Sequence, residues 1–600
     1  MKYRAEIDGL RALAVVPVIL FHAGFELFSG GYLGVDIFFV ISGYLISSII
    51  FSEVENNNFS IIEFYVRRTK RIVPLLLFVI FVFFFVFWGI MLPWDFENYG
   101  AEAFATIFFS NNFFHFLTSG NYWGTESEFK ALIHTWSLGI EEQFYIIFPL
   151  FALAMSKIKI NYQLIGYFCL FFASLYAFFA LAQKSDMLVY FMSPFRAWEL
   201  LAGILLARFT VSSVDRTAWS ELVSLAGIGL VAASILLADS SSNVVGIYNF
   251  YAVVGTVMII AMGSHKTFVG KILSSKPFVG VGLISFSLYV WHQPIFVAYR
   301  LTSLTEPKPI DYLPYIILCV ALSLASWHFI ENFFRRRLKV SNKRFITSTI
   351  VLACSLSVFS LNVFNSGGIS SRWDNYNLGH SASSRNANVL YIQTVAKEFY
   401  KTEFPSNGME NVLVIGNSFA REFINAATTH GYFRNHNVVY NNAFIPNCME
   451  IESLSEIPNR TLELLQTANH IIFPSGDFSA ECAQQDMEFL VNLNDANVVI
   501  VGTKNFGWST TANIFLAQRE GANARVPAID RELNESNLYE SYFGEKYVNT
   551  MSMLIDAQNT VPILDTSGNL LSFDTRHLTP AGASFLGQLW FEHPLLKHFK

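Results

Sequence analysis

The chain has 600 residues, of which 53% are hydrophobic and only 14% are charged, and it contains 60 Phe. Soluble globular proteins carry about 25% charged residues, so this composition excludes an ordinary soluble protein for much of the chain and indicates that the bilayer is its solvent. The formal net charge of −6 gives no sign of nucleic-acid binding, and no nucleic-acid partner is expected.

Apolar runs long enough to cross a bilayer recur through the first 365 residues. A spanning helix needs about 20 mostly apolar residues. Candidate spans, about eleven in all, lie at 10–28, 33–51, 72–92, 138–156, 163–183, 195–209, 218–238, 249–263, 278–299, 312–331 and 344–364. A weaker run at 101–117 is broken by polar residues and is expected to be re-entrant or interfacial. The sequence therefore predicts a polytopic α-helical membrane domain.

Lys and Arg gather in alternate loops, which sets the expected orientation. The basic loops lie at 2–4, 67–71, 157–159, 208–216, 266–276 and 335–344, whereas the other loops carry little beyond Lys130, Lys184, Arg300 and Lys308. The basic loops are predicted to be cytoplasmic, together with the N-terminus. Eleven crossings then place the residues after 365 outside the cytoplasm.

The first span carries two ionisable residues, Arg11 and His22, eleven positions apart. This spacing is about three helical turns, so both lie on roughly one face. Charged groups inside spans are costly and usually functional, and imidazole titrates near neutral pH, so His22 is a candidate general base or acyl-relay group. The alternative is that Arg11 reaches the cytoplasmic surface while His22 packs near the far interface.

Further polar residues recur in the later spans and suggest a polar substrate cavity open to the outside. They are His134, Glu141, Glu142, Arg196, Glu199, Tyr289 and His292. Each could instead make a helix–helix hydrogen bond. The cytoplasmic group Arg67, Arg68 and Arg71 could hold a phosphate-bearing cofactor, because Arg binds phosphate in bidentate fashion, or could merely set the topology.

These stretches resemble the membrane acyltransferase-3 family. The matching motifs are Tyr3 to Val15 with Arg11, Phe21-His22, Gly30 to Ile46, Phe64 to Pro74, His134 to Tyr145 and Ser285 to Pro294, within about residues 1–340. The resemblance implies acyl transfer from a cytoplasmic acyl-CoA, usually acetyl-CoA, to a carbohydrate outside a bacterial inner membrane. It also implies that Arg11 and His22 are functionally required.

The remainder of the chain reads differently. Residues 365–407 are polar and rich in Ser and Asn, as in a linker. A buried strand then runs from Asn411 to Gly416-Asn417-Ser418 and turns into a helix, and further strands are expected near 437–440, 469–473, 497–502 and 561–565. This alternation of strands and helices predicts an α/β domain with a parallel sheet. Ligands then bind at the carboxyl ends of the strands, where Ser418 lies.

Asp574-x-x-His577 near the C-terminus completes a candidate catalytic set with Ser418. Ser418 would be the nucleophile, His577 its base and Asp574 the orienting carboxylate, although a Ser after a strand is by itself more often structural. The set resembles SGNH-type hydrolases over residues 408–600, with Asn417 where that pattern has Asp. The usual Gly-x-Asn-Asp oxyanion block has no clear match; the backbone N–H groups of Ser418, Asn442 and Gly476 are candidates.

Five Cys are present. Three lie in apolar runs and are expected to pack there. Cys448 and Cys482 lie in the soluble part, where a disulfide is plausible if that part is extracytoplasmic, and spacing alone leaves the question open.

The sequence thus predicts a membrane domain at 1–340, a final span and linker at 341–407, and an extracytoplasmic SGNH-like domain at 408–600. The expected function is O-acetyl transfer from cytoplasmic acetyl-CoA to a surface polysaccharide, with lipopolysaccharide O-antigen as acceptor. The alternatives are peptidoglycan as acceptor, a membrane transporter fused to a carbohydrate esterase, or a glycan-binding head without catalysis. Membrane lipid and a carbohydrate are the expected partners, no metal is expected, and the oligomeric state stays open.

Overall fold

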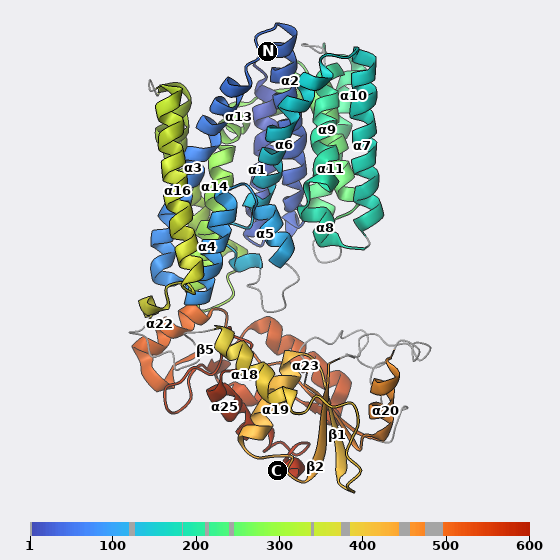
Figure 1. The fold of residues 1–600 in the computed structure, drawn as a ribbon, viewed down its shortest axis with the longest axis vertical. Coiled ribbons are helices and arrows are strands. Elements are labelled where there is room, and N and C mark those ends of the chain that lie inside the picture. The colour runs from blue at the N-terminus through green and yellow to red at the C-terminus, as the bar shows by residue number, and fades with distance from the viewer. Residues whose placement is uncertain are drawn as a thin grey trace. The chain divides into compact units, whose positions relative to one another are not determined.

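The computed structural model describes residues 3–118, 127–182, 184–209, 215–238, 245–337, 341–373, 385–442, 457–474 and 496–600. The chain divides into two compact units. Unit 1 comprises Met1–Gly89, Asp95–Tyr299 and Pro307–Gly368, and unit 2 comprises Ile90–Trp94, Arg300–Glu306 and Ile369–Lys600. Figure 1 shows that unit 1 is built from helices and that unit 2 mixes strands and helices.

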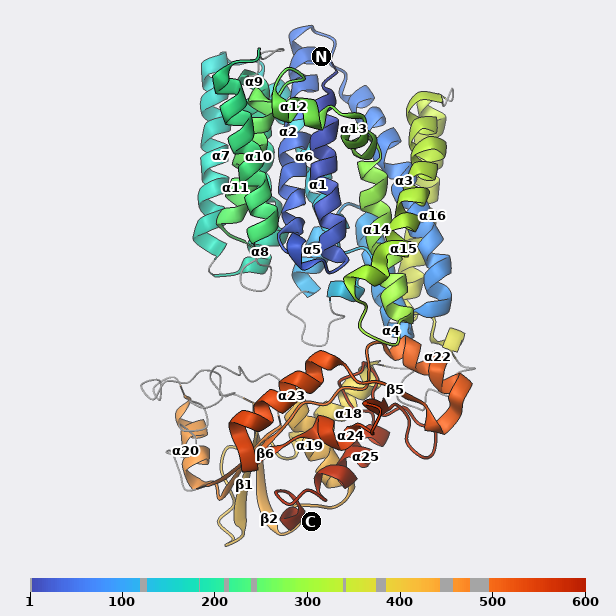
Figure 2. The same ribbon diagram turned by 180° about the vertical axis from the view of Figure 1, so that it is seen from behind.

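The helices of unit 1 follow the apolar runs of the sequence. They are α1 (Ala5–His22), α2 (Gly34–Glu55), α3 (Ile61–Ile90), α4 (Pro93–Ile107), α5 (Asn111–Thr118), α6 (Thr135–Met155), α7 (Ile160–Ala182), α8 (Asp186–Phe191), α9 (Ser193–Phe209), α10 (Ala218–Leu237), α11 (Ile247–Met262), α12 (Phe268–Leu273), α13 (Lys276–Leu283), α14 (Ser285–Thr302), α15 (Leu313–Ser326) and α16 (Asn342–Asn365). The long helices lie side by side in both views (Figures 1 and 2).

Each run that is expected to span the membrane is helical, but fewer than eleven of the described helices are both long enough and apolar enough to cross a membrane. Among the described residues, 7 helices have this length and composition, or up to 8 if α13 and α14, bent by 64°, form one span. Of the others, α1 and α9 carry charged residues, and α11 has only 16 residues. The multi-pass architecture therefore stands, while the number eleven stays a prediction.

Small residues let the helices of unit 1 approach closely. A Cβ on Gly43 of α2 would lie 2.1 Å from the carbonyl oxygen of Leu200, and a Cβ on Gly203 of α9 would lie 2.3 Å from that of Val40. Close approach through small residues is a common way for helices to associate in lipid. Helices α2 and α9 are therefore in backbone contact at these positions.

Unit 2 is built on a five-stranded parallel sheet with strand order β2-β1-β3-β4-β6. Its strands are β1 (Glu410–Ile415), β2 (His436–Asn441), β3 (His470–Pro474), β4 (Asn497–Val501) and β6 (Tyr547–Val548). The parallel α/β prediction is confirmed. The strand expected near 561–565 is not in this sheet: β7 (Thr560–Pro562) pairs antiparallel with β5 (Arg525–Pro527).

Helices cover both faces of the sheet. They are α18 (Arg385–Lys397), α19 (Ser418–Thr429), α20 (Asn459–Thr467), α22 (Thr510–Glu520), α23 (Asp530–Phe543), α24 (Thr550–Leu554) and α25 (Pro580–Trp590). Alternate residues of β1 enter two separate cores, Val412 and Val414 beside α19 and α25, and Leu413 and Ile415 beside α20 and α23. A strand that is buried on both faces has a continuous apolar sequence, and this pattern predicts β1 from the sequence.

Candidate functional site

The strand order of unit 2 reverses at β1, because β2 lies on one side of this strand and β3 on the other. In open α/β sheets, ligands bind at the carboxyl ends of the strands at such a point. Gly416 leaves β1 with φ +146°, and a Cβ there would lie 3.1 Å from both the Ala420 Cβ and the Pro474 carbonyl oxygen. Glycine therefore permits the sharp turn that starts α19 at Ser418.

Three side chains from the two ends of the domain meet at this turn. The Ser418 Oγ lies 2.9 Å from the His577 Nε2, and the His577 Nδ1 lies 2.8 Å from the Asp574 Oδ2. Ser418 is 1% exposed and His577 is 9% exposed. The structure thus brings together the three predicted residues in the order of a nucleophile, a base and an orienting carboxylate.

The turn that carries His577 is shaped by Asp574. The Asp574 Oδ1 accepts the backbone N–H groups of Arg576 at 3.1 Å and His577 at 2.7 Å, and Thr575 takes a left-handed φ of +72°. Burial lowers the pKa of His577, but the Asp574 carboxylate outweighs this effect, and the pKa lies above its usual value of 6.5. Asp574 therefore fixes both the position and the protonation of the base.

Asn417, which departs from the expected Asp, has a local structural role: its Oδ1 accepts the Phe419 N–H at 3.0 Å and caps α19. Of the candidate oxyanion donors, Ser418 lies at this helix start, where backbone N–H groups have no helical acceptor, and Asn442 is exposed. Gly476, like Cys448 and Cys482, lies outside the described residues.

Sequence reasoning missed two buried charged residues behind the triad. Glu422 of α19 and Lys504 of the loop after β4 form an ion pair of 2.6 Å, and each side chain is 1% exposed. The Glu422 Oε1 also accepts the N–H of Leu578, directly after His577, at 2.8 Å. The only available signal was a Glu one helical turn after Ser418, which is common on any helix.

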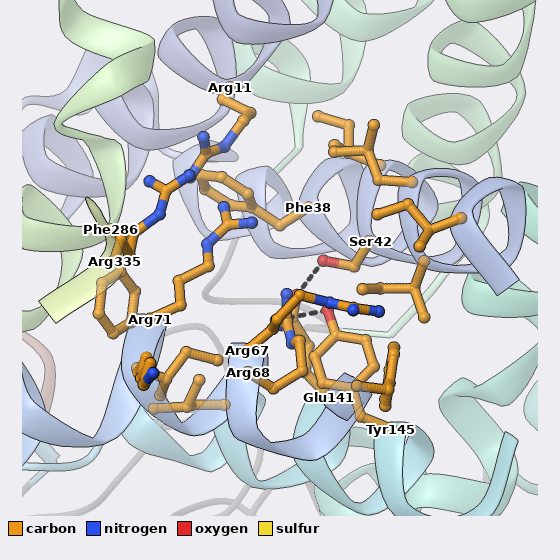
Figure 3. Close-up of a pocket in the computed structure, with 18 of the residues that line it drawn as sticks. Arg11, Phe38, Ser42, Arg67, Arg68, Arg71, Glu141, Tyr145, Phe286 and Arg335 are labelled. Carbon is orange, nitrogen blue, oxygen red and sulfur yellow. Dashed lines mark hydrogen bonds between the residues drawn. The ribbon is translucent and has the colours of Figure 1, made fainter. Parts of the chain in front are cut away.

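Unit 1 contains a cavity of about 810 Å³. Six basic side chains line it, namely Arg11, Arg67, Arg68, Lys70, Arg71 and Arg335. Figure 3 shows Arg11, Arg71 and Arg335 facing a common space, across the pocket from Glu141 and Tyr145. Arg11 also lies 3.5 Å from the Asp8 carboxylate, and guanidinium groups match the geometry of phosphate oxygens. The cavity therefore suits a ligand with several phosphate groups.

The acidic residues near this cavity are held by its walls. The Glu141 carboxylate accepts from the Ser42 Oγ at 2.7 Å and from the Tyr145 hydroxyl at 3.3 Å. The Glu142 Oε1 lies 3.7 Å from the Arg68 Nη2, and the Arg68 guanidinium stacks 4.0 Å from the Tyr145 ring centroid. These contacts hold Arg68 in place, so its position at the cavity is pre-organised.

A second polar group of unit 1 contains His22, His134 and His292. The His292 Nε2 lies 3.3 Å from the His22 Nδ1, and the His134 ring centroid lies 5.1 Å from that of His292. Tyr289, which also lines the cavity, donates its hydroxyl to the His134 carbonyl oxygen at 2.7 Å. Tyr289 thus connects the histidine group to the basic cavity.

The hydrogen bonds of this group determine which ring nitrogen of His22 is basic. The Nδ1 atoms of His22 and His292 lie 2.9 and 2.7 Å from the carbonyl oxygens of Val18 and Tyr289, which can only accept, so both Nδ1 atoms carry the proton in the neutral state. The His292 Nε2 is then an acceptor for the His22 Nδ1–H. The basic nitrogen of neutral His22 is therefore Nε2.

Arg196 and Glu199 lie elsewhere, in a buried network that joins α2, α9 and α11. The Arg196 guanidinium contacts the Glu199 Oε1 at 2.7 Å and the Asp36 Oδ2 at 3.1 Å, and the Asn249 amide donates to the Asp36 Oδ1 at 2.9 Å. Buried charges satisfied in this way can specify helix packing. Neither residue lines the basic cavity.

Comparison with known proteins identifies relatives of the membrane unit. The family model described as an acyltransferase domain matches residues 4–328. O-acetyltransferase OatA of Staphylococcus aureus is 34% identical over 352 residues, which cover 56% of this chain and 58% of that protein. Peptidoglycan O-acetyltransferase OatA of Listeria monocytogenes is 31% identical over 352 residues, 56% of each chain. The putative peptidoglycan O-acetyltransferase YrhL of Bacillus subtilis is 31% identical over 409 residues, 62% of each chain.

The chain therefore spans less than two thirds of the length of these relatives. No solved structure matches it. Among the described residues, no group of three or more His, Cys, Asp or Glu is arranged to hold a metal ion.

Proposed function

Because this chain belongs to the family of membrane acyltransferase domains, we propose that it is an O-acetyltransferase that moves an acetyl group from cytoplasmic acetyl-CoA to a sugar hydroxyl outside the membrane. The observation that carries the proposal is the presence, in one chain, of two groups of residues whose chemistry suits acyl transfer. Unit 1 holds a basic cavity that Tyr289 connects to the group of His22, His134 and His292, and unit 2 holds the Ser418–His577–Asp574 triad.

The basic cavity is the proposed site of the donor. Arg11, Arg71 and Arg335 would contact the phosphate groups of acetyl-CoA, while the apolar walls from α2 and α3 would hold its uncharged arm. The acetyl thioester would then face Tyr289 and the histidine group. His22, with Nε2 as its basic nitrogen, is the proposed relay group on the far side.

The triad of unit 2 is the proposed acetyl carrier. His577 takes the proton of Ser418 as the hydroxyl bonds to the acetyl carbon, and gives it to the group that leaves. In the second half, His577 takes the proton of the sugar hydroxyl as the sugar oxygen bonds to the acetyl carbon, and it returns this proton to the Ser418 oxygen as the bond between Ser418 and the acetyl group breaks. A partly enclosed site favours the sugar over water as acceptor.

The proposed topology places unit 2 outside the cytoplasm, on a bacterial cytoplasmic membrane. Two segments that precede residue 365, Ile90–Trp94 and Arg300–Glu306, belong to unit 2. The Trp373 indole donates to the Met91 carbonyl oxygen at 3.0 Å, and the Ser509 hydroxyl to that of Leu301 at 2.6 Å. With eleven crossings and a cytoplasmic N-terminus, these segments and unit 2 all lie on the outer side, which supports the topology.

Peptidoglycan is the acceptor that the comparisons favour. Two of the relatives named above carry peptidoglycan in their names, and none carries lipopolysaccharide. We therefore propose peptidoglycan, and not lipopolysaccharide O-antigen, as the acceptor of the acetyl group.

The proposal is tested with the full chain in vesicles supplied with acetyl-CoA and a soluble glycan fragment. Wild type is expected to acetylate the fragment, whereas Ser418→Ala and His22→Ala give no product although both reach the membrane. Acetylation at the wild-type rate by either variant would remove that residue from the pathway. Release of acetate from an acetylated glycan, with no dependence on acetyl-CoA, would show an esterase instead.

A further inference from the structure

The ion pair between Lys504 and Glu422 is unusual for its depth. Both side chains are 1% exposed, and the Nζ–Oε2 distance is 2.6 Å. Removing two charges from water is costly, and a buried pair often contributes less to stability than apolar residues of the same size. A pair retained at this depth therefore calls for a role besides stability.

Glu422 is bonded directly to the segment that carries the base. One carboxylate oxygen accepts the Leu578 N–H at 2.8 Å, and the other meets the Lys504 ammonium. Glu422 follows Ser418 by four residues, about one helical turn, so it leaves α19 on the same face as the nucleophile. A single carboxylate thus links the helix of Ser418 to the residue after His577.

The loop of Lys504 contacts the same two segments. The Lys504 Nζ lies 3.6 Å from the ring centroid of Phe419, the residue after Ser418. Two residues further along the loop, the Phe506 N–H donates to the Thr575 carbonyl oxygen at 2.8 Å, in the turn between Asp574 and His577. The loop therefore touches both the nucleophile's helix and the base's turn.

We propose that Lys504 and Glu422 are positioning residues, which set the distance between Ser418 and His577 by tying α19, the loop after β4 and the catalytic turn to one buried charge pair. The inference rests on the proposed function only in that Ser418 is the nucleophile. Neither residue is assigned contact with the acetyl group or the sugar.

One single variant and two double variants of Lys504 and Glu422 separate the effect of the two charges from the effect of the hydrogen bond to Leu578. Lys504→Met keeps most of the length of the side chain but leaves the Glu422 carboxylate buried without its cation, which disturbs the hydrogen bond that holds Leu578. The double change Lys504→Met with Glu422→Gln removes both charges and keeps an oxygen that can accept the Leu578 N–H. Lys504→Met with Glu422→Leu removes both charges and that acceptor as well.

The assay is the rate at which a fluorophosphonate probe labels Ser418 in the full chain in detergent, which needs neither donor nor acceptor. Lys504→Met is expected to slow labelling by about tenfold or more, which is the effect on a rate when one charge-assisted hydrogen bond is lost. The double variant Lys504→Met with Glu422→Gln is expected to recover most of the rate, whereas Lys504→Met with Glu422→Leu is not. Thermal unfolding of each variant identifies any that fail to fold.

The pH profile separates positioning from a merely structural role. The charge of Lys504 acts to lower the pKa of His577, whereas Asp574 and Glu422 act to raise it. Lys504→Met is therefore expected to move the midpoint of the labelling profile to higher pH, and adding Glu422→Gln is expected to return the midpoint toward wild type. The matched control is Arg525→Met, which breaks a 2.7 Å ion pair with Asp556 in the same unit and is expected to change neither the rate nor the midpoint.

Three results would overturn the inference: labelling at the wild-type rate by a folded Lys504→Met variant, equal rates when Lys504→Met is combined with Glu422→Gln or with Glu422→Leu, or an unchanged midpoint in Lys504→Met. If wild type itself is not labelled at Ser418, the proposed function of the triad fails first.

Discussion

Replacing Asp574 with Asn tests the chemistry of the triad most sharply, because the structure separates the two roles of this carboxylate. One oxygen, Oδ1, accepts the backbone N–H groups of Arg576 and His577, and an amide oxygen can keep both bonds. The other, Oδ2, faces the His577 Nδ1 at 2.8 Å, where the amide places an N–H donor instead. The fold of the turn is thus kept while its chemistry is changed.

The expected loss of rate follows from the tautomer of His577 in the Asp574→Asn variant. Facing a donor, Nδ1 must carry the lone pair, so the proton moves to Nε2, which lies 2.9 Å from the Ser418 Oγ and can no longer accept its proton. The same change in serine hydrolases costs about 10⁴-fold in rate, or about 5 kcal/mol of barrier. We expect a loss of this size in fluorophosphonate labelling of Ser418.

The labelling rate is measured beside thermal unfolding of the full chain. We expect the melting temperature of Asp574→Asn to stay close to wild type, since the backbone hydrogen bonds remain. Labelling within about tenfold of wild type in the folded variant would refute the assignment of Asp574 as the orienting group of His577.

Other predictions follow from the same geometry. Gly416→Ala is expected to lower stability by about 1–3 kcal/mol, measured by thermal unfolding, because the residue has φ +146° and its Cβ would press on the Pro474 carbonyl oxygen; unchanged stability would contradict this. Labelling of Ser418 is expected to fall as the pH drops through the raised pKa of His577, with a midpoint above 6.5, because only the neutral ring accepts a proton; a midpoint below 6.5 would contradict the ordering of charges around it. His292→Phe is expected to reduce acetyl transfer in vesicles while leaving labelling of Ser418 unchanged, since it removes one of the two acceptors of the His22 Nδ1–H and leaves only the Val18 carbonyl oxygen; equal transfer would show that His292 does not orient His22.

The α/β head was predictable because its signals are local. The strand at Asn411–Ile415 is apolar on both faces, and Gly416 marks the turn that follows it. The final strand could not be predicted correctly from its sequence: the run at 561–564 is apolar like a sheet strand, but the pairing of Thr560–Pro562 with Arg525–Pro527 depends on contacts distant in sequence. Short strands such as Tyr547–Val548 carry too few residues for a periodic signal.

The candidate sites were predictable where a motif carries the chemistry. Asp574 and His577 are three residues apart, so their contact follows from the spacing alone, whereas the pairing of Glu422 with Lys504 joins residues 82 positions apart and leaves no pattern in the sequence. Polar residues in the membrane spans all looked alike in the sequence. Only packing separates His292, which contacts His22, from Arg196, which pairs with Asp36 in a buried network.

The most direct measurement is mass spectrometry of the Ser418 peptide after the full chain, in vesicles, has been supplied with acetyl-CoA and no glycan. The account predicts an acetyl group on Ser418 in wild type, its removal when a glycan fragment is added, and its absence in His22→Ala. Acetylation of the glycan while the Ser418 peptide stays unmodified at every time point would contradict the transfer of the acetyl group through this serine.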